Sequence, residues 1–187
     1  MNAGRAIEAL LIMATEPLAA ADLAAQLGLP ERDVAAELEK LSRFYQDTSR
    51  GFELRRVAGG WRLATAPDLA ETLEAAVVAE TRVRLSQAAL ETLAVIAYLQ
   101  PVTRGRVSGV RGVNVDGVVR TLLSHGLITE AGEEPSGAMT FATTSLFLQK
   151  LGIDSLDELP DLAPLLPDAV ALEAELRAAS GIEEQHD

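Results

Sequence analysis

The sequence contains no cysteine and only two histidines. The absence of cysteine excludes a disulfide framework, a thiolate nucleophile and a thiolate-ligated metal, and it is typical of a reducing compartment. His186 lies beside the last residue, and His125 falls where a positive charge would complement the end of a helix. Carboxylates are abundant, but none stands beside a plausible acid or base partner in the sequence. We therefore expect no metal, no cofactor and no enzymatic activity.

Long hydrophobic runs are also absent. The run ALLIMA at positions 9–14 is short and lies between Glu8 and Glu16. A signal peptide needs a basic start and a longer uncharged run, and a membrane-spanning helix needs about 20 apolar residues. Apolar residues nevertheless make up 48% of the 187 residues, which is enough for one medium or two small hydrophobic cores. We expect a soluble, cytoplasmic protein.

Positive charge is scarce and unevenly distributed. The net charge is −12, divided as −4 over residues 1–79, +2 over 80–130 and −10 over 131–187. Acidic segments repel the phosphate backbone of nucleic acids. Binding to DNA would therefore have to use the middle segment alone.

An internal repeat organises the sequence. When the chain is shifted by 84 positions, small and apolar residues in its first part coincide with similar residues in its second part. The coinciding pairs are Pro17 with Pro101, Leu18 with Val102, Leu23 with Val107, Gly28 with Gly112, Val34 with Val118 and Leu38 with Leu122. Each copy reads as an apolar helix, a turn at proline, a short helix ending in glycine and a longer helix. This order favours two related modules rather than a longer repeat array.

Local signals in the second copy predict where its helices begin and end. Ser86, Thr103 and Asn114 are each placed to cap a helix N-terminus. Gly126 stands where a left-handed residue would end the third helix. The third helix has a stripe of apolar residues at i, i+3 and i+4 spacing, formed by Val115, Val118, Val119, Leu122 and Leu123. Three short helices joined by tight turns indicate a helix-turn-helix core.

A β-hairpin is predicted after each copy. The segment FELRRVAGGWRLATA at 52–66 has two β-prone runs around Gly59 and Gly60, which are typical of a two-residue hairpin turn. In the second copy, residues 127–130 and 138–144 flank a polar loop. Three helices and a hairpin make a winged helix. The predicted fold is therefore α+β and mainly helical, with two tandem winged-helix domains, each a helix-turn-helix with a β-hairpin wing.

The domain boundaries follow from these elements. A connecting helix is predicted over 67–85, with Pro67 in its first turn. The predicted divisions are 1–80 for a first winged-helix domain, 81–160 for a second winged-helix domain, and 161–187 for an acidic C-terminal tail rich in proline and leucine. Within the tail we expect a last helix near 168–179.

The residues favour protein binding over two alternatives. Glycines in 105–117 lack the pattern and the preceding strand of a phosphate-binding loop. A winged-helix DNA-binding transcriptional regulator is the stronger alternative, but the third helix of the second copy offers only Arg120 for phosphate or base contacts. By contrast, the predicted helix 87–100 is apolar around most of its circumference, more than one small module needs for its core.

The segment ETLAVIAYLQPVTRGRVSGVRGVNVDGVVRTLLSHGLI at 91–128 carries a more specific signal. It combines a Tyr-x-Gln-Pro turn, Thr-Arg, then Arg-Gly-Val-Asn and a leucine-rich third helix. EALLIMATEPL at 8–18, GGWRLAT at 59–65, SLFLQKLGI at 145–153 and SLDELP at 155–160 add to it. In these motifs the chain resembles the segregation and condensation protein B family, the winged-helix accessory subunit of the bacterial SMC–kleisin condensin complex.

This resemblance implies a non-enzymatic homodimer that binds the kleisin subunit, segregation and condensation protein A, and through it the SMC ATPase. It also implies that the first domain, 1–80, dimerises and that the second, 81–160, binds the kleisin. Such a subunit supports chromosome condensation and segregation during cell division and joins the nucleoid through the complex. The positions that match the family's kleisin-binding signature are Tyr98, Gln100, Pro101, Thr103, Arg104, Arg111, Val113 and Asn114. Of these, Arg104 and Arg111 are predicted to contact the partner, whereas Pro101 and Asn114 are predicted to shape the turn. Candidate dimerisation residues are Ile7, Leu10 and Leu11.

Overall fold

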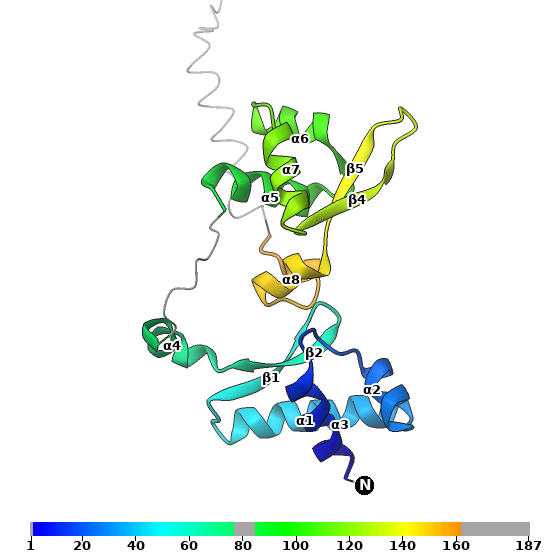
Figure 1. Cartoon of the computed structure of the whole chain (residues 1–187), viewed down its shortest axis with the longest axis vertical. Helices are drawn as coiled ribbons and strands as arrows, with labels where there is room; N and C mark the ends of the chain where they lie inside the picture. The colour runs from blue at the N-terminus through cyan, green and yellow to red at the C-terminus, as the bar shows by residue number, and fades with distance from the viewer. Residues whose placement is uncertain (1, 77–84, 162–187) are drawn as a thin grey trace, which may run out of the picture. The chain divides into compact units, whose positions relative to one another are not determined.

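A computed structural model of the chain describes residues 2–76 and 85–161 (Figure 1). The chain divides into two units, residues 1–156 and 157–187, and nearly all the described helices and strands belong to the first. Two successive sets of helices, each followed by a β-hairpin, lie in this first unit. The predicted α+β fold of two tandem winged helices is thus confirmed. We call these sets the first and the second module.

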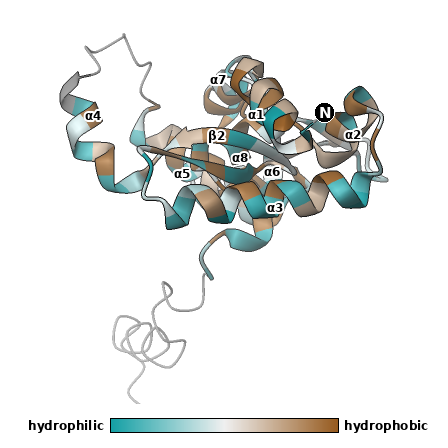
Figure 2. Ribbon diagram, turned by 90° about the horizontal axis from the view of Figure 1, so that it is seen from below, coloured by the Kyte–Doolittle hydropathy of each residue, from teal (hydrophilic) through white to brown (hydrophobic). Residues whose placement is uncertain are grey.

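The first module contains α1 (Ala3–Met13), α2 (Ala20–Leu27), α3 (Glu31–Asp47), β1 (Phe52–Val57) and β2 (Gly60–Thr65). Asn2 caps α1, because its side-chain oxygen accepts a hydrogen bond from Arg5 N. In α3, residues spaced three or four apart form one apolar side, and brown and teal residues alternate along this helix in Figure 2. Its buried residues are Val34, Leu38, Leu41 and Tyr45. They join Ile7, Leu23 and Leu54 in a single core.

The second module contains α5 (Gln87–Leu99), β3 (Val102–Thr103), α6 (Arg104–Arg111), α7 (Asp116–Ser124), β4 (Ile128–Glu133), β5 (Met139–Thr143) and α8 (Ser145–Leu151). Its strands form an antiparallel sheet in the order β3-β5-β4. The short strand β3 was not predicted. It closes one edge of the sheet by pairing Val102 with Phe141, and both side chains are buried.

Most of the predicted caps in the second module are confirmed. Ser86 accepts a hydrogen bond from Ala89 N, and Thr103 accepts one from Arg106 N. Gly126 has a φ of +67°, and Leu127 N donates to Leu122 O, so α7 ends as predicted. The prediction for Asn114 was one position off. Val115 is the N-cap of α7, and Asn114 Oδ1 instead accepts from Asp116 N in the turn before it.

The structure reproduces the internal repeat. The 84-residue offset carries the bounds of α2 onto those of α6. The glycines after these helices, Gly28 and Gly112, have φ values of +64° and +66°, the left-handed conformation that ends a helix. Next to each repeated proline, Leu18 bridges to the β2 strand as Val102 pairs with β5. The two copies therefore share a third extended segment beside the hairpin.

The turn of the first hairpin differs from the prediction. Val57 pairs with Gly60, so Ala58 and Gly59 form the turn, with φ values of +53° and +77°. Gly60 lies in β2 and serves a different purpose. A Cβ atom on Gly60 would be 2.9 Å from the backbone carbonyl carbon of Pro17. The missing side chain lets the Leu18 segment approach β2 closely enough for its two backbone hydrogen bonds with Trp61.

The predicted connecting helix is described in part. Residues Pro67–Leu69 form the 3₁₀ helix η1, and α4 covers Ala70–Ala76. The rest of that prediction, 77–84, and the predicted helix near 168–179 lie outside the described residues. A second 3₁₀ helix, η2, covers Leu156–Glu158. Among the helices that the structure describes, none is long and apolar enough to span a membrane.

Candidate partner-binding site

Several predicted binding residues hold the second module together. Gln100 Oε1 accepts hydrogen bonds from the backbone N and the hydroxyl of Thr143, at 2.7 and 3.0 Å, and its amide nitrogen donates to Ala97 O. This half-buried side chain therefore ties the end of α5 to the end of β5. Thr103 and Asn114 act as a cap and a turn residue, as described above. These three residues shape the fold.

Arg104 is only partly available to a partner. Its guanidinium nitrogen Nη1 lies 3.4 Å from Asp116 Oδ1, and its Cζ lies 5.4 Å from the centre of the Phe141 ring. The ion pair is exposed on both sides and contributes little to stability. A shallow pocket of about 310 Å³ adjoins this residue. Its walls are Thr103, Arg104, Gly105, Glu130, Ala138, Met139 and Phe141.

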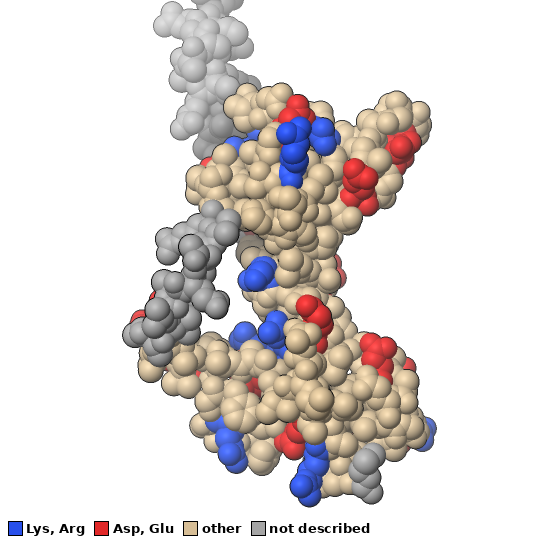
Figure 3. Space-filling view, in the orientation of Figure 1, with Lys and Arg blue, Asp and Glu red and all other residues tan. Residues whose placement is uncertain are grey.

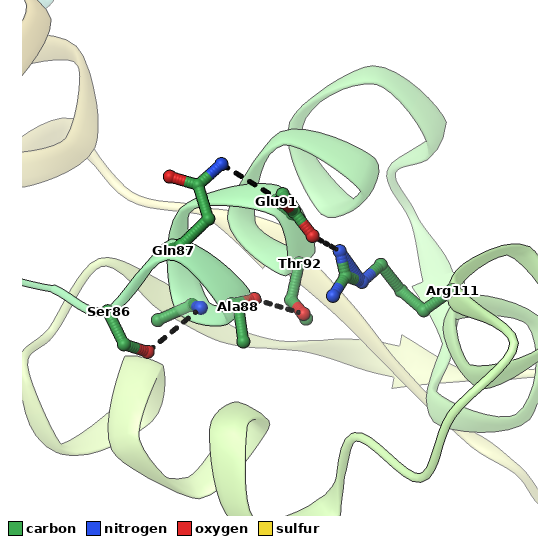
Figure 4. Close-up of polar contacts among 7 residues, drawn as sticks. Ser86, Gln87, Ala88, Glu91, Thr92 and Arg111 are labelled. Carbon is green, nitrogen blue, oxygen red and sulfur yellow. Dashed lines mark hydrogen bonds and ion pairs between the residues drawn. The ribbon is translucent and has the colours of Figure 1, made fainter.

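Arg111 points inward and pairs with Glu91 of α5 (Figure 4). Only 14% of the Arg111 side chain is exposed, and its Nη1 forms a hydrogen-bonded ion pair with Glu91 Oε2. Gln87 Nε2 donates to the other carboxylate oxygen of Glu91 at 3.0 Å. The hydrogen bond from Gln87 and then the charge of Arg111 lower the pKa of the Glu91 carboxyl. Within the described part of the chain, Arg111 Nε is buried without a hydrogen-bond partner. Arg111 thus joins α6 to α5.

Two exposed valines lie at the end of α6 and just after it. Val110 is 58% exposed and Val113 is 56% exposed, whereas Val107 of the same helix is buried. Val113 is one of the predicted binding residues, but Val110 was not predicted. The sequence does not distinguish Val110, because a residue three positions after the buried Val107 would be expected on the same side of the helix. Of the other predicted residues, Pro101 is exposed and Tyr98 is half-buried.

A second hollow on this module is apolar and larger, about 690 Å³. It lies among α5, the end of α7 and α8, with Lys150 and His125 among its walls. The remaining wall residues are Leu85, Leu90, Leu93, Leu127, Leu146, Phe147 and Leu151. This groove was not predicted, because its walls come from three segments that only the fold brings together.

The candidate dimerisation residues lie mostly inside the first module. Ile7 and Leu11 are buried at 0% and 4% exposure, and Leu10 packs partly buried against the same core. Their part in dimerisation stays a prediction. The exposed apolar residues of α1 are Ile12 and Met13, at 76% and 80% exposure.

The β4–β5 hairpin, which is the wing of the second module, is acidic. Residues 128–143 include three glutamates and neither lysine nor arginine. In Figure 3 the β4–β5 hairpin shows red atoms and no blue ones on the visible face. Arg120 is the single basic residue of α7. A winged helix that reads DNA contacts it with these two elements, so these charges disfavour DNA binding by the second module.

Comparison with known proteins decides the family. The family model of the segregation and condensation complex subunit ScpB matches residues 5–162, which include both modules. The chain belongs to this family. A segregation and condensation protein B of Moorella thermoacetica is 42% identical over 182 residues, covering 96% of this chain and 91% of the relative.

Solved structures of ScpB proteins are also similar in sequence. The crystal structure of ScpB from Mycobacterium tuberculosis is 49% identical, covers 81% of this chain and 95% of its own, and has a TM-score of 0.40. A structure described as a dimer of the ScpB N-terminal domain complexed with ScpA peptide is 32% identical. It covers 40% of this chain and 94% of its own, with a TM-score of 0.39.

Proposed function

We propose that this chain is the non-enzymatic accessory subunit that dimerises and binds the kleisin subunit of an SMC complex. It supports chromosome condensation and segregation during cell division, in the cytoplasm and at the nucleoid. The match of the ScpB family model to residues 5–162 carries this proposal. The partner is a kleisin of the ScpA type, the protein whose peptide is bound in the related N-terminal domain structure. The kleisin connects the subunit to the SMC ATPase.

On the second module, the kleisin contact is centred on the exposed end of α6. Val110 and Val113 supply exposed apolar side chains there. Arg104, at the start of the same helix, supplies a positive charge whose only described ion pair is with an exposed aspartate. Arginine is enriched among the energetically important residues of interfaces, and the exposed valines add apolar area that a partner can bury. Arg111 supports this surface from behind through Glu91 instead of contacting the kleisin.

On the first module, the second copy of the chain contacts the exposed end of α1. Ile12 and Met13 are free of the core that buries Ile7 and Leu11. Burial of two such side chains between copies would stabilise the dimer by the hydrophobic effect. Replacement of both by aspartate should shift the protein from dimer to monomer in light scattering, whereas a dimer that survives would exclude this surface.

The decisive experiment is co-expression with a kleisin of the ScpA type. The two proteins should co-purify, and light scattering should give a mass that contains two copies of this chain. A gel shift with duplex DNA at low and moderate salt should show no complex. If the chain does not bind the kleisin but binds DNA in a salt-dependent way, it is instead a transcriptional regulator, and the proposal is wrong.

Two variants test the contact surface within that experiment. Val113→Asp should weaken kleisin binding by about tenfold or more, because it places a charge in an apolar contact. Arg111→Glu combined with Glu91→Arg reverses the charges of this pair, in which only the arginine is largely buried, and should leave binding near the wild-type value. If the reversed pair abolishes binding while the circular dichroism spectrum is kept, Arg111 itself contacts the kleisin.

A further inference from the structure

The turn of the β1–β2 hairpin binds a carboxylate of this same chain. Gly59 N donates to Asp154 Oδ1 at 2.8 Å, and Arg56 Nη2 lies 3.1 Å from Asp154 Oδ2. The preceding N–H, that of Ala58, donates to Ile153 O at 3.0 Å. Two consecutive backbone donors and one guanidinium thus hold two consecutive residues that follow α8.

The conformation of the turn explains why it accepts an anion. Ala58 and Gly59 both have positive φ, a conformation in which successive N–H groups form a concave binding site for negative groups. Arg56 is held nearby, since its Cζ lies 5.9 Å from the centre of the buried Trp61 ring. Only 24% of the Asp154 side chain is exposed, so solvent and salt screen this pair less than a free surface pair.

These contacts connect the two modules. Gly59 belongs to the wing of the first module, whereas Asp154 follows α8 of the second and is 95 residues away in the sequence. One further hydrogen bond connects the same parts, from Gln149 Nε2 of α8 to Glu16 Oε2 at 2.8 Å. Both of these side chains lie near the surface, so this second bond is more open to competition from water.

We propose that Asp154 is a latch that holds the second module to the wing of the first. In the latched state its carboxylate is bound by Gly59 N–H and Arg56. When the carboxylate leaves, the segment after α8 separates from the wing and the two modules become free to change their orientation. This device is independent of the kleisin, and it gives the subunit two states that a partner can select.

The absence of cysteine makes this proposal directly measurable. Ala25→Cys in α2 and Ser124→Cys at the end of α7 are exposed positions for a pair of nitroxide labels in an otherwise cysteine-free chain. Double electron–electron resonance spectroscopy then measures the distribution of distances between the two labels, one on each module. The labelled parent should give one dominant distance.

Asp154→Asn and Arg56→Gln should each add a broad second population. We expect the ratio of open to latched molecules to rise about tenfold, because each variant removes a charge-assisted hydrogen bond. Asp161→Asn is the matched control, since Asp161 is exposed in the same segment, and it should leave the distribution unchanged. The circular dichroism spectrum of each variant verifies that the modules stay folded. If neither Asp154→Asn nor Arg56→Gln changes the distribution, or if the control broadens it equally, the latch does not exist.

Discussion

The close packing of Gly60 against Pro17 leads to a quantitative prediction for Gly60→Ala. The added Cβ would lie 2.9 Å from the Pro17 carbonyl carbon and 3.1 Å from Leu18 N. Both atoms belong to backbone that is fixed by the hydrogen bonds of Leu18 with Trp61, at 2.8 and 2.9 Å. Relief therefore requires a backbone shift, and forced packing of this kind costs about 1–3 kcal/mol.

One opposing effect reduces that cost. Gly60 does not have a positive φ, so alanine can adopt its conformation, and the loss of chain entropy on folding is smaller for alanine by about 0.4–1 kcal/mol. We expect a net decrease of about 1–2 kcal/mol in the free energy of unfolding, from these two contributions. With a urea m-value of about 2 kcal/mol/M, the midpoint should fall by roughly 0.5–1 M.

Gly4→Ala is the matched control in the same module. A Cβ on Gly4 would lie only 2.6 Å from Glu37 Oε1, which is closer than the contact at Gly60. That atom, however, is the end of a flexible side chain whose partner is the exposed Lys40. Glu37 can move away, and alanine stabilises a helix relative to glycine by about 0.5–1 kcal/mol. We expect Gly4→Ala to be neutral or slightly stabilising.

Urea unfolding followed by fluorescence measures both variants, because Trp61 is the only tryptophan and lies in the first module. Circular dichroism provides a second probe that does not depend on the surroundings of this ring. A Gly60→Ala midpoint equal to that of the wild type, or a larger loss for Gly4→Ala, would refute the argument that rigid backbone decides the cost.

Two further predictions concern single side chains. Tyr45 donates a hydrogen bond of 2.6 Å to Glu8 Oε1, and burial, followed by this bond, raises the pKa of Tyr45 to about 12. In the unfolded chain the Tyr45 hydroxyl ionises near pH 10. The stability that its raised pKa contributes is therefore fully present below pH 10 and is lost as the pH rises towards 12. Tyr45→Phe should remove this part of the pH dependence of the urea midpoint, and parallel curves for both proteins would contradict the assignment. Ser86→Ala removes the cap of α5 and should lower stability by about 1 kcal/mol in the same assay, whereas Ser86→Asp, which keeps an acceptor, should retain most of it.

Local features of the fold could be read from the sequence. Ser86 and Thr103 cap their helices, and Gly126 ends α7. These roles were predictable because each depends only on neighbours within a few residues. The repeat also predicted matching helices, since Gly28 and Gly112 both end a helix in the left-handed conformation. Such signals act over one turn of chain and need no knowledge of the tertiary structure.

Features that depend on distant segments could not be read in this way. Gly60 looked like a turn residue, but its role is set by Pro17, about forty residues earlier in the chain. The pairing of Arg111 with Glu91 also depends on the packing of α6 on α5, and its contact with the kleisin stays a prediction. For the same reason the predicted dimerisation residues Ile7 and Leu11 could not be distinguished from core residues, whereas the exposure of Ile12 and Met13 is known only once the module is folded.

The acidic wing of the second module has a consequence for how the subunit works on a chromosome. A winged helix with a basic wing is attracted to the DNA backbone whatever its sequence, so it also binds non-specific sites. Glu130, Glu133 and Glu134 give this wing the opposite sign, so nearby DNA pushes it away. In the proposed function, a subunit with such a wing is attached to the chromosome by the protein that it binds and not by contacts between this wing and DNA.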